Sequence, residues 1–312
     1  MTPVRRYLLA TLIILAGAVH AAEQVKIGAY VMRLNDLNPT TASFSTDVWV
    51  WTLSSAASPL HPIQTLRLQD TKSVTGDVPG EADQNGVRWG YREFAAVMNQ
   101  NWDTRQFPFD HHTLVIPIAE TMYDVDTLKY VPDGVGSHID PRVNVPGWRI
   151  TRARLETRTI DYPSRFGDPD PHKSNSHWSE AWLLIDVRRN GLGIFFKIIM
   201  VAYIAFALVM LSFLMDAAVF SSRISMLVGC LFATVVNMRA SESVIGRTDS
   251  FTLIDQIHLL VAFFIFVSAV LALAMRRTEV ERAKRIDRWA AIASVVVFVA
   301  ANAVLIGRAF AN

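Results

Sequence analysis

Hydrophobic positions are distributed very unevenly along this chain. Before residue 193 they alternate with polar positions in short runs, whereas beyond it they form long apolar stretches. Four such stretches occupy residues 198–215, 224–238, 257–275 and 289–306, and each is long enough with its flanks to cross a bilayer as a helix. The pattern predicts a polar, strand-rich half followed by four transmembrane helices at about residues 194–215, 222–243, 252–275 and 288–308.

Short alternating runs dominate residues 22–190. Residues 25–31 and 46–51 have the period of two that is typical of half-buried strands, and residues 114–118 and 182–187 are compact β-prone runs. No amphipathic segment of helix length interrupts them, and residues 161–177, rich in Pro, Asp, Ser and Gly, predict a long hairpin loop. We therefore expect an extracellular all-β, immunoglobulin-like sandwich followed by an all-α four-helix transmembrane bundle.

The two ends of the predicted bundle differ in charge. Between the third and fourth stretches, six basic residues outnumber three acidic ones, which places this connector in the cytoplasm. Residues 1–21 have the charged start, the apolar run and the small-residue end of a secretory signal, and the run is shorter than the ~20 residues of a membrane span. The predicted organisation is a signal peptide (1–21), an exported sandwich (22–190) and a four-helix pore domain (191–312).

Composition excludes several classes of function. Cys230 is the only cysteine, so the exported half has no intrachain disulfide, and a net charge of +2 gives no reason to expect a nucleic-acid partner. Nucleotide-binding, metalloprotease and serine-hydrolase motifs do not occur, so we expect neither a cofactor nor an enzyme. His111 and His112 are neighbours on a predicted strand and point to opposite faces, which favours surface histidines over a metal site.

The second apolar stretch differs from the other three. Its positions 225, 229, 232, 236 and 239 follow a 4-3-4-3 spacing and form one stripe of a helix, occupied by Ser225, Gly229, Phe232, Val236 and Arg239. Small residues on such a stripe allow close helix packing, which is the simpler explanation for the first two. An arginine at membrane depth requires a bundle interior or a water-filled cavity. A stripe that faces a central pore accounts for all five residues.

Several further segments share an order and spacing. Trp102-Asp103-Thr104-Arg105-Gln106-Phe107-Pro108-Phe109-Asp110 is preceded by Ile27-Gly28-Ala29-Tyr30 and Asp47-Val48-Trp49-Val50-Trp51. It is followed by Pro146-Gly147-Trp148, by Asp186-Val187-Arg188-Arg189 and by residues 245–256. Together these segments resemble the pentameric ligand-gated ion channels, the Cys-loop receptor superfamily, and in particular its bacterial branch that lacks the signature cysteines. The resemblance covers nearly the whole of the chain that follows the predicted signal peptide.

The resemblance implies a homopentamer in a bacterial inner membrane, with the N-terminal domain periplasmic. The second span would line the pore with the five stripe residues and Arg223 at its cytoplasmic foot, and Phe232 would form a hydrophobic constriction. Coupling between the sandwich and the pore would use an Asp110–Arg188 ion pair and the residues around it. The implied coupling residues are Phe107, Pro108, Phe109, Asp110, Arg188 and Thr248.

The implied ligand site lies between neighbouring sandwiches, under the long hairpin. It would be formed by Thr121, Met122, Tyr123, Tyr162 and Trp178 and would bind a small-molecule or ion agonist, of which a cationic amine suits the aromatic residues. Each aromatic residue also fits the core of the sandwich, and for Tyr123 the core is the favoured position.

Departures from the family keep other functions open. No carboxylate lies between Asp216 and Glu242, where cation-selective members carry an acidic ring, so Arg223 and Arg239 indicate anions. The usual proline of the first span is replaced near Met200. The segment at residues 59–72 is shorter than the corresponding segment of the family, which carries another binding loop there. A membrane-anchored sensor of the same architecture that does not conduct is the main alternative. A membrane hydrolase is disfavoured, because no nucleophile, base and orienting group are recognisable.

Overall fold

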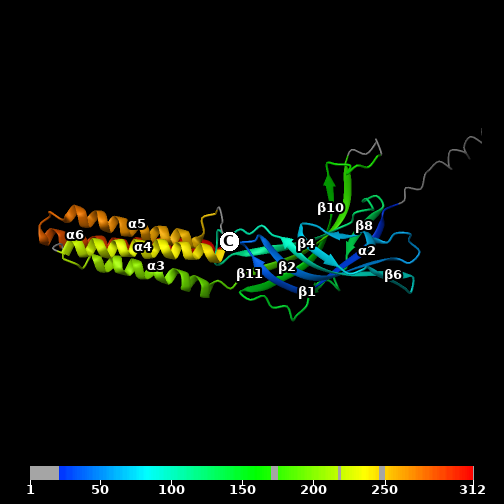
Figure 1. Cartoon of the computed structure of the whole chain (residues 1–312), viewed down its shortest axis with the longest axis horizontal. Helices are drawn as coiled ribbons and strands as arrows, with labels where there is room; N and C mark the ends of the chain where they lie inside the picture. The colour runs from blue at the N-terminus through cyan, green and yellow to red at the C-terminus, as the bar shows by residue number, and fades with distance from the viewer. Residues whose placement is uncertain (1–20, 170–174, 217–218, 246–249, 312) are drawn as a thin grey trace, which may run out of the picture.

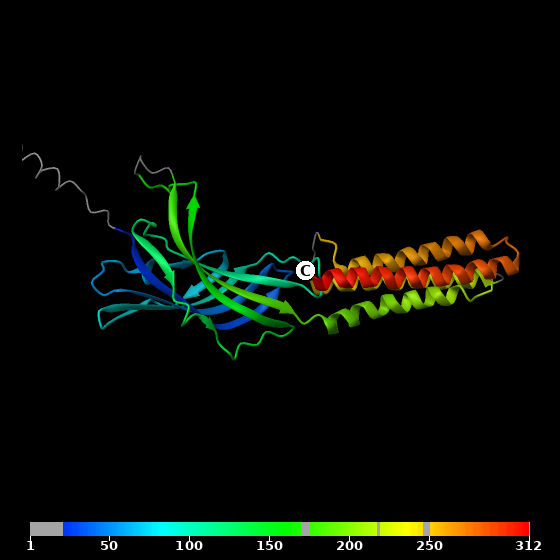
Figure 2. The ribbon, with the colours of Figure 1, turned by 180° about the vertical axis from the view of Figure 1, so that it is seen from behind.

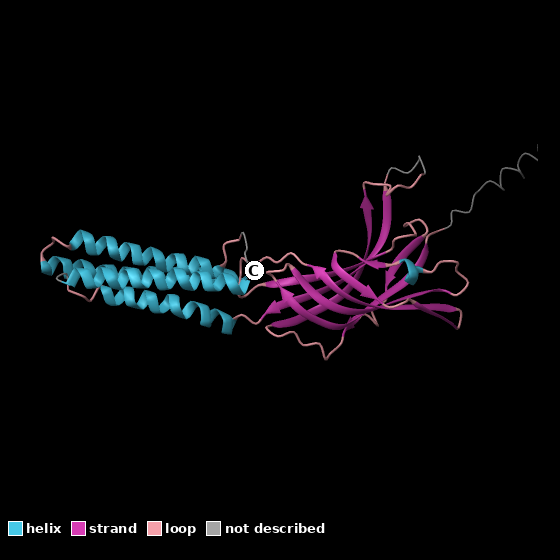
Figure 3. Ribbon diagram, viewed as in Figure 1, coloured by secondary structure: helices cyan, strands magenta, loops and turns pink. Residues whose placement is uncertain are grey.

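The structure is a computed structural model that describes residues 21–169, 175–216, 219–245 and 250–311. A β-rich N-terminal region and a bundle of long helices lie end to end along the molecule (Figure 1; Figure 3). Nearly all of the predicted signal peptide lies outside the described residues. The strands are β1 Glu23–Asn38, β2 Ser43–Ser55, β3 Arg67–Leu68, β4 Thr71–Gly76, β5 Gly80–Gln84, β6 Val87–Asn99, β7 His111–Ala119, β8 Leu128–Pro132, β9 His138–Ile139, β10 Trp148–Tyr162 and β11 Ser176–Arg189.

The described strands form two sheets. The larger sheet has the order β4-β6-β2-β1-β8, with β5 beside β6 and β9 beside β1, and the smaller has the order β10-β11-β7-β3. All pairs are antiparallel except those of β1 with β8 and with β9. One apolar core lies between the sheets, so the prediction of a two-sheet N-terminal region is confirmed.

The alternation of apolar and polar residues along the predicted strands explains how they pack. In β1, Val25, Ile27, Ala29 and Val31 are fully buried on one side of the strand. All four runs predicted from the sequence lie within strands, namely β1, β2, β7 and β11. The predicted hairpin loop is slightly shorter than expected, because β10 continues to Tyr162 and β11 begins at Ser176. Residues 170–174 of this loop lie outside the described part of the chain.

Within the described residues, four helices are long and apolar enough to cross a membrane, which supports a multi-pass membrane protein. Three of them begin and end within three residues of the predicted bounds. The fourth begins eight residues earlier than predicted, because its first turns are charged and a hydropathy pattern detects the apolar part alone. The helices are the short α2 Pro62–Thr65, followed by α3 Leu192–Ser212, α4 Phe220–Ile245, α5 Leu253–Met275 and α6 Val280–Ala311.

The helices run alternately away from and toward the sandwich. The end of α6, marked C, lies beside the sandwich, whereas the connector between α5 and α6 lies at the far end of the bundle (Figure 2). The basic residues of that connector and the first turns of α6 therefore lie at the opposite end of the long helices from the β-rich region. This arrangement agrees with the charge asymmetry of the sequence.

Candidate functional site

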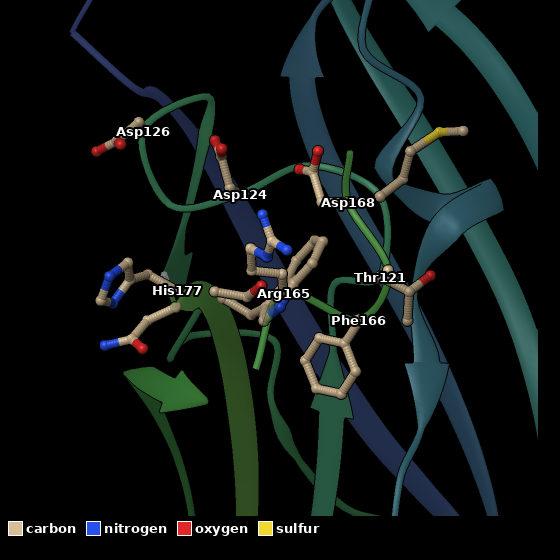
Figure 4. A pocket seen from close by; sticks show the side chains of 12 residues that line it. Thr121, Asp124, Asp126, Arg165, Phe166, Asp168 and His177 are labelled. Atoms are coloured by element: carbon tan, nitrogen blue, oxygen red, sulfur yellow. The ribbon is translucent and has the colours of Figure 1, made fainter. Parts of the chain in front are cut away.

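The β10–β11 hairpin covers two adjoining cavities at the side of the sandwich. The larger has a volume of about 550 Å³ and is lined by the loop after β7 and by the hairpin (Figure 4). Asp124, Asp126 and Asp168 lie along one edge of it in this view, and Thr121 and Phe166 lie below them. The smaller, of about 380 Å³, is lined by Gln69, Glu120, Thr121, Tyr162, Phe166 and Trp178.

Four of the five residues predicted for a ligand site lie around these cavities. Thr121 and Trp178 line both, Met122 lines the larger, and Tyr162 lines the smaller. Tyr123 is partly buried against the sandwich core, which is the position favoured for it from the sequence. The Tyr162 and Phe166 rings meet edge to face, with their centroids 5.4 Å apart. The hairpin therefore brings three of its own aromatic side chains, Tyr162, Phe166 and Trp178, together around the smaller cavity.

Two buried carboxylates, Glu120 and Glu180, support this site from below. Each residue is 2% exposed. Glu120 accepts hydrogen bonds from the backbone of residues 121–123 at 2.9, 2.9 and 3.3 Å and from the Tyr130 hydroxyl at 2.8 Å. Glu180 accepts from the Tyr162 hydroxyl at 2.9 Å and from Trp182 Nε1 at 2.7 Å. Among the described residues, no lysine or arginine forms an ion pair with either carboxylate.

Burial shapes the electrostatics of the site. Burial, and then the neighbouring Glu120 carboxylate, raise the pKa of Tyr130 well above its ordinary value. Burial, and then the hydrogen bond to Glu180, likewise raise the pKa of Tyr162. Both tyrosines therefore remain neutral hydrogen-bond donors to the carboxylates. Buried carboxyl groups that lie beside aromatic rings and have no basic partner form an environment that suits a cation.

The outer face of the larger sheet carries a second group of aromatic residues, which sequence reasoning missed. The Trp49 and Tyr91 rings are stacked, with centroids 5.6 Å apart and an angle of 6° between their planes. Trp89 lies 4.6 Å from Tyr91, and Trp51 crosses Gly28 so closely that a Cβ there would lie 2.1 Å from its ring. The period of two in Trp49 and Trp51, and again in Trp89 and Tyr91, is the signal that could have revealed this face.

The loop between β6 and β7 packs between the sandwich and the helices. Phe107 and Phe109 are buried in a cluster with α3 and α5 residues, and the Phe109 ring lies 4.5 Å from Phe310 of α6. Pro108 approaches the start of α3 so closely that a Cβ on Gly191 would lie 1.8 Å from its carbonyl oxygen, which leaves room for glycine alone. The predicted coupling residues Phe107, Pro108 and Phe109 thus lie at the junction. Thr248 is outside the described residues.

Asp110 forms an ion pair at this junction, but the predicted partner is wrong. Its carboxylate accepts hydrogen bonds from Arg189 at 2.7 and 3.0 Å and contacts His112 Nε2 at 2.7 Å. Arg188 is exposed, because it alternates with the buried Val187 and points to the opposite face of β11 from Arg189. The Arg189 guanidinium also lies 4.0 Å from the centre of the Trp148 ring.

The prediction that both histidines lie on the surface is wrong for His112. His111 is exposed, as expected, but His112 is 7% exposed and packs between Trp102 and Trp148. The two residues do point to opposite faces of β7. Within the described part of the chain, no group of three or more His, Cys, Asp or Glu side chains is positioned to hold a metal ion.

The stripe predicted on the second span lies on one exposed face of α4. Its residues are all exposed outside the bundle of the single chain, Phe232 by 68% and Val236 by 65%. None of the five is among the buried residues of the helix bundle. The remaining stripe residues, Ser225, Gly229 and Arg239, are exposed as well.

Arg223 does not belong to this face, so its predicted place at the pore is wrong. It is 3% exposed and forms a bidentate pair with Asp287 of α6, with both N···O distances 3.0 Å. Arg239 is exposed but contacts Glu242 at 3.1 Å. Because both arginines have acidic partners, their charges no longer support the predicted preference for anions.

Arg223→Gln is expected to reduce sharply the yield of folded protein. The substitution would leave Asp287 buried without its partner, and breaking a buried pair from one side costs about 3–5 kcal/mol. The double variant Arg223→Leu/Asp287→Leu is expected to recover most of the yield, because it removes both charges. Fluorescence-detected gel filtration of detergent extracts measures the yield of folded protein for both variants. Equal yields for the single variant and the unmodified protein would contradict the assignment.

A scan of known protein families finds no model that matches this chain, and a search of curated proteins finds no match either. The resemblance to the pentameric channels therefore rests on the residues and the arrangement described above.

Proposed function

We propose that the chain is one subunit of a ligand-gated ion channel that assembles as a homopentamer in a bacterial inner membrane. Its immunoglobulin-like sandwich would lie in the periplasm, and an extracytoplasmic ligand would open a pore lined by α4. The exposed stripe of α4, which combines Ser225 and Arg239 with Phe232, is the observation that carries this proposal. The protein would be a transport protein and not an enzyme.

Lipid alone is a poor environment for that face. The mean hydropathy of α4 is the lowest of the four membrane-length helices, and its exposed stripe ends at the charged Arg239, beside the exposed Glu242. Charged side chains at membrane depth require water or a protein partner. The bundle of one chain leaves this face uncovered, and a ring of identical chains would enclose it around water. Five Phe232 side chains would then form an apolar constriction in the ring.

The smaller hairpin cavity supports a cationic small molecule as the ligand. The Tyr162 and Trp178 rings and Glu120 line it, and Glu180 lies behind Tyr162, whose hydroxyl donates to it. Neither carboxyl forms an ion pair with a basic side chain in the described structure. The faces of the aromatic rings and a nearby carboxylate would each contribute favourable electrostatic energy to the binding of an organic ammonium group. In a ring of subunits, the cavity of one copy would face the aromatic residues of the next copy's larger sheet.

The junction supports transmission from the ligand to the pore. The loop of residues 102–110 is held to β11 by the Asp110–Arg189 pair and to α5 by a 3.0 Å hydrogen bond from Leu253 N–H to the Arg105 carbonyl. A displacement of the hairpin strands would therefore move a loop that also packs on α3, α5 and α6.

Reconstitution of the purified full-length protein tests this function. Negative-stain images of detergent-solubilised protein should show five-fold rings, and planar bilayers should show unitary currents when a panel of organic amines is added to the sandwich side. Monomers or dimers would contradict the pore. Five-fold rings without current under any condition would favour the alternative function of a sensor that does not conduct.

Trp178→Ala is expected to raise the half-maximal concentration of an activating amine by about 2- to 30-fold. The loss of one ring from the cavity removes a cation–π contact, which is worth about 0.5–2 kcal/mol. Dose–response curves of reconstituted channels measure the shift. Trp289→Ala provides the matched control, because Trp289 is 67% exposed on α6, far from the cavity. A midpoint that moves less than about twofold in the Trp178 variant would place the ligand elsewhere.

A further inference from the structure

Three basic side chains lie side by side where the smaller sheet meets the helices. Arg149 of β10 is directly opposite Arg188 of β11, and Arg188 is directly opposite His111 of β7. Opposed residues of antiparallel strands share a face, so the three side chains form one patch, and all three are exposed. We refer to these residues as the basic patch.

The basic patch is electrostatically uncompensated. In the described residues, neither Arg149 nor Arg188 forms an ion pair with a carboxylate, and the first turn of α3 contains no acidic residue. Further along the same face, by contrast, Arg154 pairs with Glu156 and Asp186. Like charges directly opposite each other destabilise a sheet unless something neutralises them. The patch therefore has the properties of a site for an anion.

A cavity of about 370 Å³ adjoins the basic patch and combines two kinds of surface. Arg149 and Arg188 form its basic side, and Phe109, Leu192 and Phe310 contribute apolar side chains. Leu192 is 61% exposed and Phe310 is 50% exposed, at the start of α3 and at the end of α6. The ends of β10 and β11 meet the bundle here, beside the point marked C (Figure 2).

We propose that this cavity binds the headgroup of an anionic phospholipid from the leaflet that faces the sandwich. The phosphate would lie between Arg149 and Arg188, because guanidinium groups bind phosphate oxygens in a bidentate manner. The acyl chains would continue along Leu192 and Phe196, which is 64% exposed on the outside of α3. A soluble anion would use the arginines but would leave these apolar side chains uncovered.

The bound lipid would contact the junction directly. Phe109 and Arg189 also line the cavity, and both belong to the contacts that hold the loop of residues 102–110 between sheet and helices. The anionic lipid content of the membrane would thereby affect the stability of the junction. This inference requires only that the four helices span a membrane and does not depend on conduction.

Lipid binding to the full-length protein in detergent micelles tests the proposal. Native mass spectrometry would follow lipid adducts during titration with phosphatidylglycerol or phosphatidylcholine, and the melting temperature would be recorded in parallel. The unmodified protein should bind phosphatidylglycerol preferentially and gain thermal stability from it. Arg149→Gln/Arg188→Gln should weaken that binding by about tenfold or more, and Arg149→Lys/Arg188→Lys should retain part of it.

Arg33→Gln/Arg152→Gln is the matched control, since it removes the same charge from exposed sandwich positions outside the cavity. It should bind phosphatidylglycerol as the unmodified protein does. Equal binding by the Arg149/Arg188 variant, or an equal loss in the control, would overturn the proposal. Displacement of the lipid by millimolar glycerol phosphate would overturn the assignment to a lipid and identify a site for soluble anions.

Discussion

Arg189→Gln is expected to lower the melting temperature of the detergent-solubilised protein by roughly 6–20 °C, whereas Arg188→Gln should leave it nearly unchanged. The two arginines are neighbours on β11 and have the same charge, but their environments differ. The Arg189 side chain is 9% exposed and is paired with Asp110, which is itself 1% exposed. Arg188 is exposed and forms no ion pair with a carboxylate among the described residues.

The size of the effect follows from burial. Removing one partner of a buried pair leaves the other charge in a low-dielectric site, at a cost of about 3–5 kcal/mol. His112 still contacts Asp110 in the variant, and this contact places the expected loss toward the lower end. An exposed arginine without a partner contributes well under about 1 kcal/mol. Similar melting temperatures for the two variants would show that Arg189 is not the residue that holds the loop.

The same pair predicts an acid dependence. Burial opposes ionisation of Asp110, but the hydrogen bonds from His112 and Arg189 outweigh it, so the pKa of Asp110 lies below its ordinary value of 3.8. A lowered pKa in the folded state contributes stability that is present above the ordinary value and is lost as the pH falls through the folded value. The unmodified protein should therefore lose more stability than Arg189→Gln when the pH is lowered below about 4.

Much of the architecture could be predicted because it follows from hydropathy. The apolar stretches predicted the four long helices, and alternation predicted β1, β2, β7 and β11. The strand β10 gave a weaker signal, because the outer part of its hairpin projects from the body and many of its residues are exposed (Figure 1). In β6, Trp89 and Tyr91 occupy the outer face, while Phe94 and Met98 are buried on the other face. Because both faces carry apolar residues, the sequence of β6 does not alternate clearly between apolar and polar positions.

The partners of charged residues could not be predicted in the same way. Arg188 and Arg189 are adjacent, and a shift of one residue in strand register exchanges the buried side chain with the exposed one. Arg223 pairs with Asp287, which lies 64 residues further along the chain, and no local pattern links them. The family resemblance predicted a group of residues for a ligand site. The carboxyl groups of Glu120 and Glu180 behind them were found only from burial and hydrogen bonding in the structure.

Phe232→Ala is expected to increase current in the absence of agonist by about tenfold, which corresponds to a shift of ~1.4 kcal/mol between the closed and open states. This prediction rests on the proposed channel function. Phe232 is the large aromatic residue on the exposed face of α4, with 68% of its surface uncovered in the single chain. Five such rings around an axis would exclude water from a narrow pore, and five alanines would leave the constriction wide and wet.

Phe266→Ala is the control, because Phe266 is 67% exposed on α5 and differs from Phe232 mainly in the helix that carries it. Both substitutions remove an exposed ring and should cost little stability in the single chain. A difference between the currents of the two variants would therefore come from the position of the ring and not from misfolding. Planar-bilayer recordings without agonist, on preparations shown to be pentameric by native mass, measure it. Unchanged current in the Phe232 variant would move the gate to another level of α4. An equal increase in both variants would mean that the leak arises from general loosening of the bundle, because a lipid-facing ring cannot gate a central pore.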